Sequence, residues 1–310
     1  MKALLKGAFA ASLLSLCLAL PAAAEPAMWK VSDEDSSVYL FGSIHVFTRD
    51  LNWRTPLLDE QVAAAEHVYF ELLFDDAAFA TIGRAMLVEG RLRDGRTLWD
   101  VLTPEQGEEV RTAAAAAGLD PVTFERMTPW MTEVLLSSAL IQGAVGGVEM
   151  ALFAEVETAR QRGLETAEEQ LGFFAAGSEA EQVENLMLTV RMLGAPDSMN
   201  SIDEMMLAWE RGDADLLYEV ISNDAASTHD RYNVLITGRN ERWTTRVEQM
   251  LAENDDALVV VGAGHLVGPG GVPALLAERG FEVERVGDVP ADRAGAGRTG
   301  RPDPRAARPR

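Results

Sequence analysis

The alternation of apolar and polar positions predicts β-strands at both ends of the chain. Residues 29–31 and 38–41 are apolar segments separated by a polar turn, a pattern typical of a β-hairpin. Residues 67–72 and 257–261 are short and almost wholly apolar, as expected of strands that are covered on both faces. A last strand is expected at residues 281–286. The predicted sheet therefore combines segments from the two ends of the chain.

One order of elements occurs twice. A strand leads into Gly-x-x-His, a loop, a helix and a second strand, and the two copies lie about 220 residues apart. The motifs run from Gly42 to His45 and from Gly262 to His265, and the helices are expected from Pro56 and at residues 272–279. We therefore predict an α/β fold with a pseudo-symmetric central sheet built from two β-loop-α-β units. Both histidines are expected beyond carboxyl strand ends, where open α/β sheets bind ligands.

The segment between the two units has a helical pattern. Polar capping residues, followed by proline or by a glutamate or glutamine three residues later, predict successive helix starts. These capping residues are Thr103, Asp120, Thr128, Ser178 and Ser201. We therefore expect residues of about 75–252 to form a helical insertion, a lid or second lobe, whose last helix covers about residues 230–251.

The two ends of the chain are predicted to lie outside the folded domain. Residues 1–24 combine two lysines, an apolar run too short to span a bilayer and, immediately before Glu25, a run of three alanines, which indicates a signal peptide cleaved after Ala24. A membrane anchor is the weaker alternative. Residues 291–310 contain six arginines and almost no large apolar residue, so we expect a disordered basic tail, either solvated or in contact with an acidic partner. Residues 25–290 are then a single domain of an exported protein, periplasmic or secreted.

Composition limits the chemistry of the mature chain. The only cysteine, Cys17, lies in the predicted signal peptide, which excludes disulfides, thiol nucleophiles and thiolate metal sites afterwards. The formal net charge of −22 becomes −24 when Lys2 and Lys6 leave with the signal. Such an acidic chain is a poor partner for nucleic acid or an anionic membrane surface. Any metal must be held by histidine and carboxylate groups.

The two motif histidines are the first candidates for a functional site. A glycine permits a tight turn at a strand end, so the imidazoles of His45 and His265 are expected to point into the crevice beyond the sheet. The alternative is that both are hydrogen-bonded structural groups that cap the strands. That structural role is the one we assign to the two other histidines, His67 and His229.

Glu71 is the candidate third group. It is an acidic residue in an otherwise apolar strand, and a buried carboxylate is costly unless it is paired or binds a cation. The alternative is an edge strand on which Glu71 faces solvent. Two imidazoles and a carboxylate leave positions on a divalent ion open for water, and the ion lowers the pKa of that water and polarises a carbonyl. Metal-assisted hydrolysis is therefore the predicted reaction.

Five segments of the chain resemble the TraB/GumN family, which is related to the Tiki proteins. They are residues 40–46, 70–72, 164–170, 239–243 and 261–266. The resemblance extends from about Trp29 to Val286, nearly the whole mature chain. That family is described by two Gly-x-x-His motifs with a conserved glutamate and arginine, and its Tiki members are metal-dependent proteases. More distant relatives of similar fold include erythromycin esterases and a haem-binding lipoprotein.

The resemblance implies roles for individual residues. His45 and His265 match the motif histidines and, with Glu71, are the implied ligands of a divalent ion, Mn²⁺, Co²⁺ or Zn²⁺. Arg239 matches the family arginine, and Glu165 matches the glutamate of a Leu-Glu-Thr segment. Glu71, Glu165 and Arg239 are thus the implied catalytic residues. The implied substrate is a peptide or another carbonyl compound.

Two of these residues have structural alternatives, and one departure from the family concerns the same region. Arg239 lies on a long predicted helix and could be a solvated partner of nearby glutamates. The segment after Glu165 could be only a helix cap, because Thr166 and Glu169 form a capping box. Family members have a strand before Leu-Glu-Thr, whereas here a helix is expected to run through residues 155–162 directly into that segment.

Three hypotheses follow from the sequence. The first is an exported metal-dependent hydrolase, and the second is a binding protein for haem, a metal ion or a small ligand. The third is a scaffold with a vestigial site. A serine hydrolase is disfavoured, because Ser43 lies on a tight loop two residues before His45 and is not part of a Gly-x-Ser-x-Gly elbow.

Overall fold

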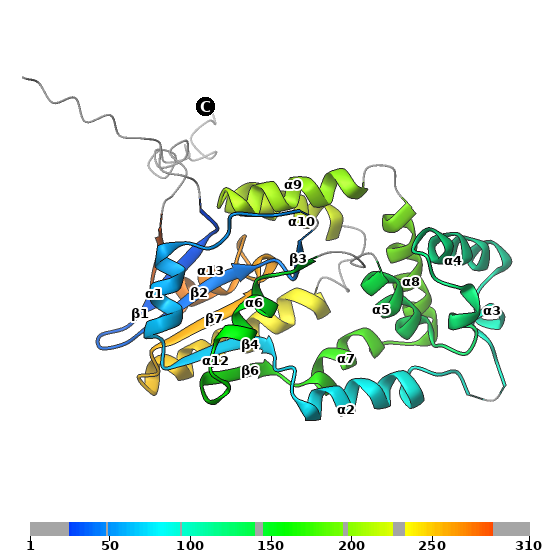
Figure 1. The fold of residues 1–310 in the computed structure, drawn as a ribbon, viewed down its shortest axis with the longest axis horizontal. Coiled ribbons are helices and arrows are strands. Elements are labelled where there is room, and N and C mark those ends of the chain that lie inside the picture. The colour runs from blue at the N-terminus through cyan, green and yellow to red at the C-terminus, as the bar shows by residue number, and fades with distance from the viewer. Residues whose placement is uncertain are drawn as a thin grey trace, which may run out of the picture.

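A computed structural model describes residues 25–47, 49–93, 95–139, 145–194, 198–225 and 233–287. The predicted signal peptide, the predicted basic tail and His229 lie outside the described residues. Within them, the chain forms a six-stranded sheet flanked by helices and, at one end, a helical lobe (Figure 1).

The sheet is mixed and contains strands from both ends of the chain. Its strands are β1 (Met28–Ser32), β2 (Ser37–Ser43), β4 (His67–Leu72), β6 (Gln161–Glu165), β7 (Ala257–Gly262) and β8 (Glu282–Val286). They lie in the order β6-β4-β7-β2-β1-β8. The first four are parallel, whereas β1 runs antiparallel to β2 and to β8. A separate antiparallel ribbon pairs β3 (Val46–Phe47) with β5 (Val145–Gly146).

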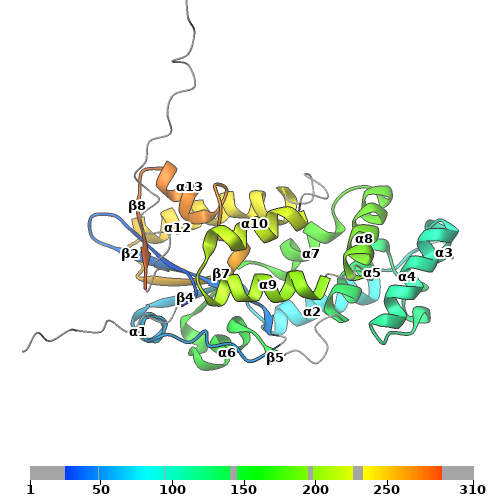
Figure 2. The same cartoon turned by 90° about the horizontal axis from the view of Figure 1, so that it is seen from above.

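The central strands are buried on both faces, because their side chains alternate between two hydrophobic cores. In β4, Val68 and Phe70 face one core and Tyr69 faces the other. The helices over the first core are α1 (Pro56–Ala64), α6 (Val148–Glu155), α9 (Ser198–Glu210) and α10 (Ala214–Ala225). Those over the second core are α12 (Gly238–Ala252) and α13 (Val272–Glu278). Figure 2 shows α12 and α13 on the side of the sheet opposite α1 and α6.

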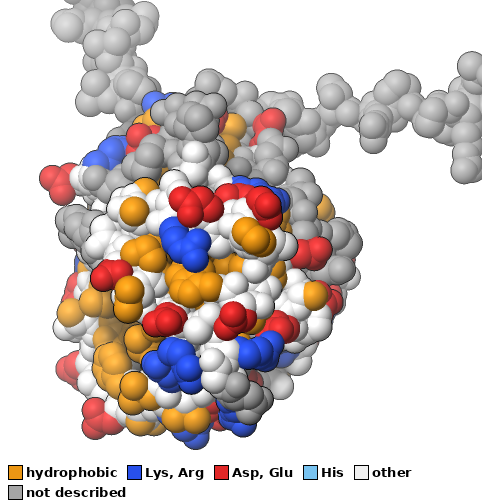
Figure 3. Space-filling model, turned by 90° about the vertical axis from the view of Figure 1, so that its right-hand side faces the viewer, with side chains coloured by type: hydrophobic (Ala, Val, Ile, Leu, Met, Phe, Trp, Pro, Cys, Tyr) orange, Lys and Arg blue, Asp and Glu red, His pale blue; other side chains and the backbone are white. Residues whose placement is uncertain are grey.

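The helical lobe has a third hydrophobic core of its own. Its helices are α3 (Leu98–Val101), α4 (Pro104–Ala116), α5 (Pro129–Ala139) and α8 (Glu179–Gly194). The helices α2 (Asp76–Arg84) and α7 (Ala167–Ala175) lie between this lobe and the sheet (Figure 1). The predicted caps are present at Thr103, Thr166 and Ser178, each bonded to a residue three positions later. The predicted start at Ser201 is wrong, because α9 already begins at Ser198. On the end of the molecule formed by the lobe, acidic, basic and apolar side chains are interspersed (Figure 3).

Short helical segments of other types complete the described chain. Two are π-helices, η1 (Ala85–Glu89) and η4 (Asn233–Thr237). Three are 3₁₀ turns, η2 (Pro121–Phe124), η3 (Thr158–Arg160) and η5 (Ala263–His265). None of the helices in the described ranges is long and apolar enough to cross a membrane.

The strand β6 corrects the expectation of a helix running through residues 155–162. α6 ends at Glu155, and residues 161–165 pair with β4 instead. This segment is too polar for an apolar pattern to identify it as a strand. It is nevertheless stable as one, because at the edge of the sheet only one side of its backbone must be paired. The region between the two units is therefore not wholly helical.

The α/β class is confirmed, but the two β-loop-α-β units occupy different positions. The first runs from β2 through α1 to β4 and crosses one strand, β7. The second runs from β7 through α13 to β8 and crosses both β2 and β1. The last long helix also begins later than expected, at Gly238 after the π-helix η4.

Candidate functional site

Four parallel strands end at one edge of the sheet and carry the candidate residues there. Their last residues are Ser43, Leu72, Glu165 and Gly262. The register aligns Ser43 with Gly262 and Leu72 with Glu165. Since neighbouring strands are about 4.8 Å apart, residues far apart in the sequence come within contact distance at this edge.

Arg239 lies at the centre of the site, in the first turn of α12. Its Nη2 donates to Glu71 Oε2 at 2.6 Å and to Glu165 Oε2 at 2.8 Å, and its Nε lies 3.0 Å from Glu165 Oε1. The guanidinium also lies over the Trp243 ring, 4.6 Å from its centroid. Arg239 is only 8% exposed, so the alternative of a solvated arginine is wrong and the side chain turns inward. This residue ties α12 to both β4 and β6.

His265 follows β7 and is buried. Its Nδ1 lies 2.6 Å from Asn240 Oδ1, and its Nε2 lies 3.1 Å from Arg239 Nη1. The amide of Asn240 is oriented by its own Nδ2, which donates to the Gly270 carbonyl. Because a carbonyl oxygen only accepts and a guanidinium only donates, Nδ1 of His265 carries the proton and Nε2 has the lone pair. Burial and the nearby Arg239 charge lower the pKa of His265 to about 3, so this imidazole is neutral at pH 7.

His45 lies in the loop between β2 and β3, and its side chain is 63% exposed. Its Nδ1 is 2.7 Å from Oε1 of Glu149, in the first turn of α6. The same carboxylate oxygen accepts a hydrogen bond from Ser43 Oγ. Desolvation lowers the pKa of His45, but the hydrogen bond and the charge of Glu149 outweigh it and raise the pKa to about 9. His45 therefore holds a proton at neutral pH.

Glu71 lies in β4, an inner strand of the sheet, and is 9% exposed, so the alternative of a solvent-facing edge strand is wrong. Its Oε1 accepts a hydrogen bond from the Gly262 N–H at 2.7 Å. Burial alone would raise the pKa of Glu71. Positive charge on His265, His45 and Arg239, together with this N–H, outweighs burial and lowers the pKa to about 2. At pH 7, where His265 is neutral, Arg239 and His45 supply that charge.

Gly262 marks the point on which these groups converge. A Cβ atom built on it would lie 3.1 Å from Glu71 Oε1, 3.4 Å from His45 Nε2 and 3.6 Å from His265 Cδ2. The structure thus brings the two motif histidines and Glu71 together in one place. Glu165 is not among these groups. It binds Arg239, which in turn binds Glu71.

The motif glycines serve a different purpose from the expected tight turn. Gly262 has an ordinary φ of −50°, and neither glycine is among those with positive φ. What they provide is space. A Cβ on Gly262 would fill the gap between the three site residues, and one on Gly42 would lie 3.1 Å from the backbone of Ala263.

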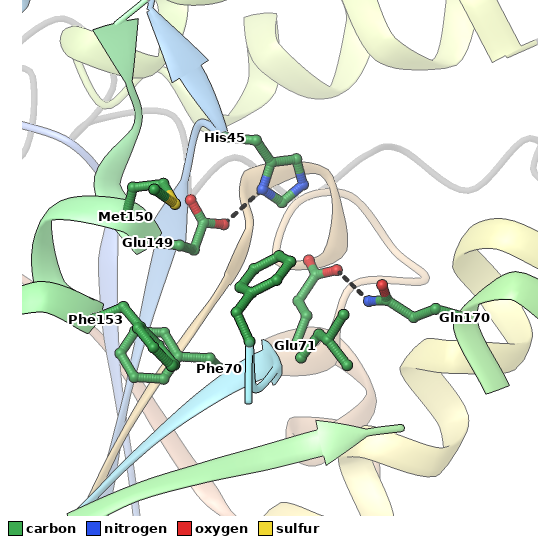
Figure 4. Close-up of a pocket in the computed structure, with 9 residues that line it drawn as sticks. His45, Phe70, Glu71, Glu149, Met150, Phe153 and Gln170 are labelled. Carbon is green, nitrogen blue, oxygen red and sulfur yellow. Dashed lines mark hydrogen bonds and ion pairs between the residues drawn. The ribbon is translucent and has the colours of Figure 1, made fainter. Parts of the chain in front are cut away.

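A cavity of about 270 Å³ opens beside His45 and Glu71. Its other polar groups are Glu149 and Gln170, whose Nε2 lies 3.5 Å from Glu71 Oε2. Figure 4 shows the imidazole of His45 above the carboxylate of Glu71, with Glu149 and Gln170 on either side. Two of the candidate residues, His45 and Glu71, therefore line a space that a small molecule or part of a larger one can enter.

The donor types at this site fit a divalent ion, but the groups are not arranged as a finished metal site. His45 Nε2, His265 Nε2 and Glu71 Oε1 are the nitrogen and oxygen donors that Mn²⁺, Co²⁺ and Zn²⁺ accept. His265 Nε2 lies 4.0 Å from Glu71 Oε1 and is in contact with Arg239 Nη1. In the part of the chain that the structure describes, no group of three or more His, Cys, Asp or Glu side chains has the geometry of a metal site. An ion at this position requires Arg239 Nη1 to leave His265.

Three residues at the site were not identified from the sequence. Glu149 and Asn240 each bind the Nδ1 atom of a motif histidine, and Gln170 contacts both Glu71 and Glu165. Asn240 follows Arg239 directly, and Gln170 ends the Leu-Glu-Thr segment, so both lay within the segments that carried the family resemblance. Glu149 had no comparable signal.

His67 has the structural role expected of it. Its Nδ1 lies 2.9 Å from Asp255 Oδ1, and the other oxygen of Asp255 accepts a hydrogen bond from Tyr69. This group lies where β4 begins, at the end of the strand away from Glu71. It is therefore not part of the site.

Comparison with known proteins gives one match. A sequence model described as the TraB/PrgY/gumN family matches residues 27–285, which include every residue of the site described above. No curated protein and no solved structure gives a significant match.

Proposed function

The chain belongs to the TraB/PrgY/gumN family, and on that premise we propose that it is an exported metal-dependent hydrolase that cleaves a peptide or another carbonyl compound. The observation that carries the proposal is the convergence of His45 Nε2, Glu71 Oε1 and His265 on Gly262, at the mouth of a cavity. Each imidazole has its Nδ1 bonded to an acceptor, Glu149 or Asn240. Such outer partners orient metal-binding histidines so that Nε2 points to the ion.

In this proposal, His45, His265 and Glu71 hold a divalent ion, Mn²⁺, Co²⁺ or Zn²⁺. When bound, the ion lowers the pKa of a water molecule and polarises the carbonyl group of the substrate. Neutral His265 requires no deprotonation, and its Nε2 lone pair, which now accepts from Arg239 Nη1, would be available to the ion once that contact is released. His45 must release the proton on Nε2 before that atom can hold the ion, while Nδ1 keeps its proton and its contact with Glu149.

Arg239 and Glu165 act around this centre. Arg239 keeps Glu71 ionised. Glu165 fixes the Arg239 guanidinium by accepting hydrogen bonds from its Nε and Nη2 atoms. Arg239 Nη1 is left to contact His265 Nε2 and the Leu235 carbonyl. With an ion held at His265 Nε2, Arg239 Nη1 would be free to donate to the oxygen on which negative charge develops during hydrolysis.

A mechanism without metal has less support. A general base works best when its pKa lies near the working pH. The pKa of His45 is raised to about 9 and that of His265 is lowered to about 3, so neither imidazole meets this condition at neutral pH.

The first experiment is metal analysis of the purified mature protein after exposure to each of the three ions. We expect one equivalent in the wild type, loss of the metal in His45→Ala and His265→Ala, and retention in His67→Ala, a histidine variant outside the site. Above about pH 9, where the pair with Glu149 no longer contributes, His45→Ala should hardly change the melting temperature of the metal-free protein, because the His45 side chain is largely exposed. A metal-free wild type that still hydrolyses a carbonyl substrate would instead assign the reaction to a histidine as general base.

The second experiment is cleavage of a broad peptide library with each ion supplied. Cleavage should disappear with a chelator and in Glu71→Ala and His265→Ala, provided that these variants still fold. If no peptide is cut while haem or another small ligand binds stoichiometrically at the same residues, the protein is a binding protein. Mass analysis of the protein recovered outside the cytoplasm tests export, because cleavage of the signal should leave Glu25 as the first residue.

A further inference from the structure

The cavity beside the site has a polar side and an apolar side. His45 and Glu71 lie on the polar side, and Phe70, Phe153 and Met150 supply much of the rest of the lining. Figure 4 shows Glu71 to one side of the Phe70 ring, with Met150 and Phe153 on the other. A molecule that places a reacting group at the histidines therefore places a neighbouring group against aromatic rings.

The apolar side continues out of the cavity as a row of aromatic rings. The centroid of Phe153 lies 5.5 Å from that of Phe70 and 6.3 Å from that of Phe74, and Phe74 lies 6.3 Å from Phe79. Phe74 is 43% exposed, and Phe79 and Met150 are each 60% exposed. Contiguous apolar side chains that remain exposed beside a polar site are typical of a surface that binds a ligand.

The size of the cavity limits what it can hold. Pockets for whole small molecules have volumes of roughly 300–1,000 Å³, and this one has about 270 Å³. It is therefore suited to a single large side chain rather than to an extended planar group such as a porphyrin. Its aromatic lining favours an apolar group, which gains from burial against Phe70 and Phe153.

We propose that this cavity is a specificity subsite that binds an aromatic or large aliphatic side chain of the substrate, next to the carbonyl group that is hydrolysed. Phe74 and Phe79 extend the subsite for a second apolar group further along the same molecule. The substrate class is thus a peptide, or a related amide or ester, with a bulky apolar residue at the cleaved bond. This inference rests on the proposed hydrolase function.

Binding without turnover tests the subsite directly. Calorimetry on the full mature chain would compare N-acetyl-phenylalanine amide with N-acetyl-alanine amide. We expect the phenylalanine compound to bind at least about tenfold more tightly, because the additional ring is buried against apolar side chains. Met150→Asp and Phe74→Ser should abolish most of this difference. Met192→Asp is the matched control, since Met192 is also an exposed methionine, 51% exposed, on α8 in the helical lobe.

Cleavage of the peptide library separates failure of the subsite from failure of the proposed function. Cleavage at bulky apolar residues that weakens in Met150→Asp supports both. Cleavage with no preference for such residues, or equal binding of the two amides, overturns the subsite and leaves the hydrolase. Preferential binding of the phenylalanine amide without cleavage of any peptide keeps the subsite and removes the hydrolase.

Discussion

At the scale of single residues, Glu149 has the clearest role among those that no sequence pattern indicated. Its carboxylate fixes the Nδ1 side of the His45 ring and leaves Nε2 pointing toward Gly262. Its other oxygen, Oε2, is buried and has no hydrogen-bond partner in the described structure. Both contacts of this carboxylate, with His45 and with Ser43, are made through Oε1.

Removing the charge of Glu149 should change the titration of His45. In Glu149→Gln, we expect the pKa of His45 to fall from about 9 toward its ordinary value of 6.5. Because folding raises this pKa, the pair stabilises the folded protein most below pH 6.5, and this contribution is lost as the pH rises through about 9. Glu149→Gln should therefore flatten the dependence of the unfolding free energy on pH in that window.

NMR titration of the His45 ring in metal-free protein measures the effect. Ser43→Ala is the control, since it removes the hydroxyl that donates to Glu149 but keeps the carboxylate charge. The pKa of His45 should stay near 9 in that variant. An unchanged pKa of His45 in Glu149→Gln would show that a group other than Glu149 raises it.

At the scale of secondary-structure elements, Arg239 connects one helix to two strands. Through its ion pairs with Glu71 and Glu165, α12 is attached to β4 and β6 at the edge of the sheet where the site lies. A second arginine on the same helix, Arg242, lies 3.3 Å from Glu165 but is half exposed. The two arginines allow a buried ion pair and an exposed one to be compared within one helix.

We expect Arg239→Met to destabilise the protein by about 3–5 kcal/mol, because two buried carboxylates lose their partner. Arg242→Met should cost less than about 1 kcal/mol, since its pair is largely solvated. Urea unfolding at pH 7 measures both. Adding Glu71→Gln and Glu165→Gln to Arg239→Met should restore part of the loss, and a lack of any recovery would mean that packing of the guanidinium, not its charge, matters.

The ion pair between Arg239 and Glu71 should also affect the stability of the protein at acidic pH. The pKa of Glu71 is lowered in the folded protein, so its contribution to stability is present above about pH 4.5 and is lost as the pH falls toward about 2. In Arg239→Met the pKa of Glu71 should rise. The loss of stability between about pH 4.5 and pH 2 should then be smaller than in the wild type, because the pKa of Glu71 in the folded protein lies closer to its value in the unfolded chain.

At the scale of the whole molecule, the sheet and the helical lobe have separate hydrophobic cores. Leu186 is fully buried in the lobe, and Val260 is fully buried in the sheet beneath the site. Helices that pack on their own core can open without exposing the rest of the protein. The lobe is therefore expected to respond to mutation as a unit distinct from the sheet.

Leu186→Ala tests this separation. The variant should lose about 2–5 kcal/mol, because a buried leucine is replaced by a cavity. Hydrogen exchange should become faster in α4, α5 and α8, while the amides of β7 keep their wild-type protection. Val260→Ala is the reciprocal variant, with faster exchange expected in the sheet. Equal acceleration everywhere in Leu186→Ala would show that the two cores unfold together.

Much of the sheet and three of the site residues, His45, His265 and Glu71, could be predicted from local pattern. The runs at residues 67–72 and 257–261 are apolar on both faces, which only a covered strand requires, and the repeated Gly-x-x-His places His45 and His265 at strand ends. β6 could not be predicted, because its residues form no apolar pattern and its partner, β4, lies about 90 residues earlier. An edge strand forms because it pairs with a neighbouring strand. The residues of the edge strand alone do not indicate that partner.

The sequence by itself determined the α/β class, several helix starts and the types of residue in the site, because caps, apolar periodicity and composition act over a few positions. Only the tertiary structure decided that Arg239 turns inward, that Glu149 binds His45 and that Asn240 sets the tautomer of His265. These contacts join residues from different elements, and their geometry follows from strand order and helix packing. Charge and protonation at the site depend on those same distances, so they too are properties of the folded chain.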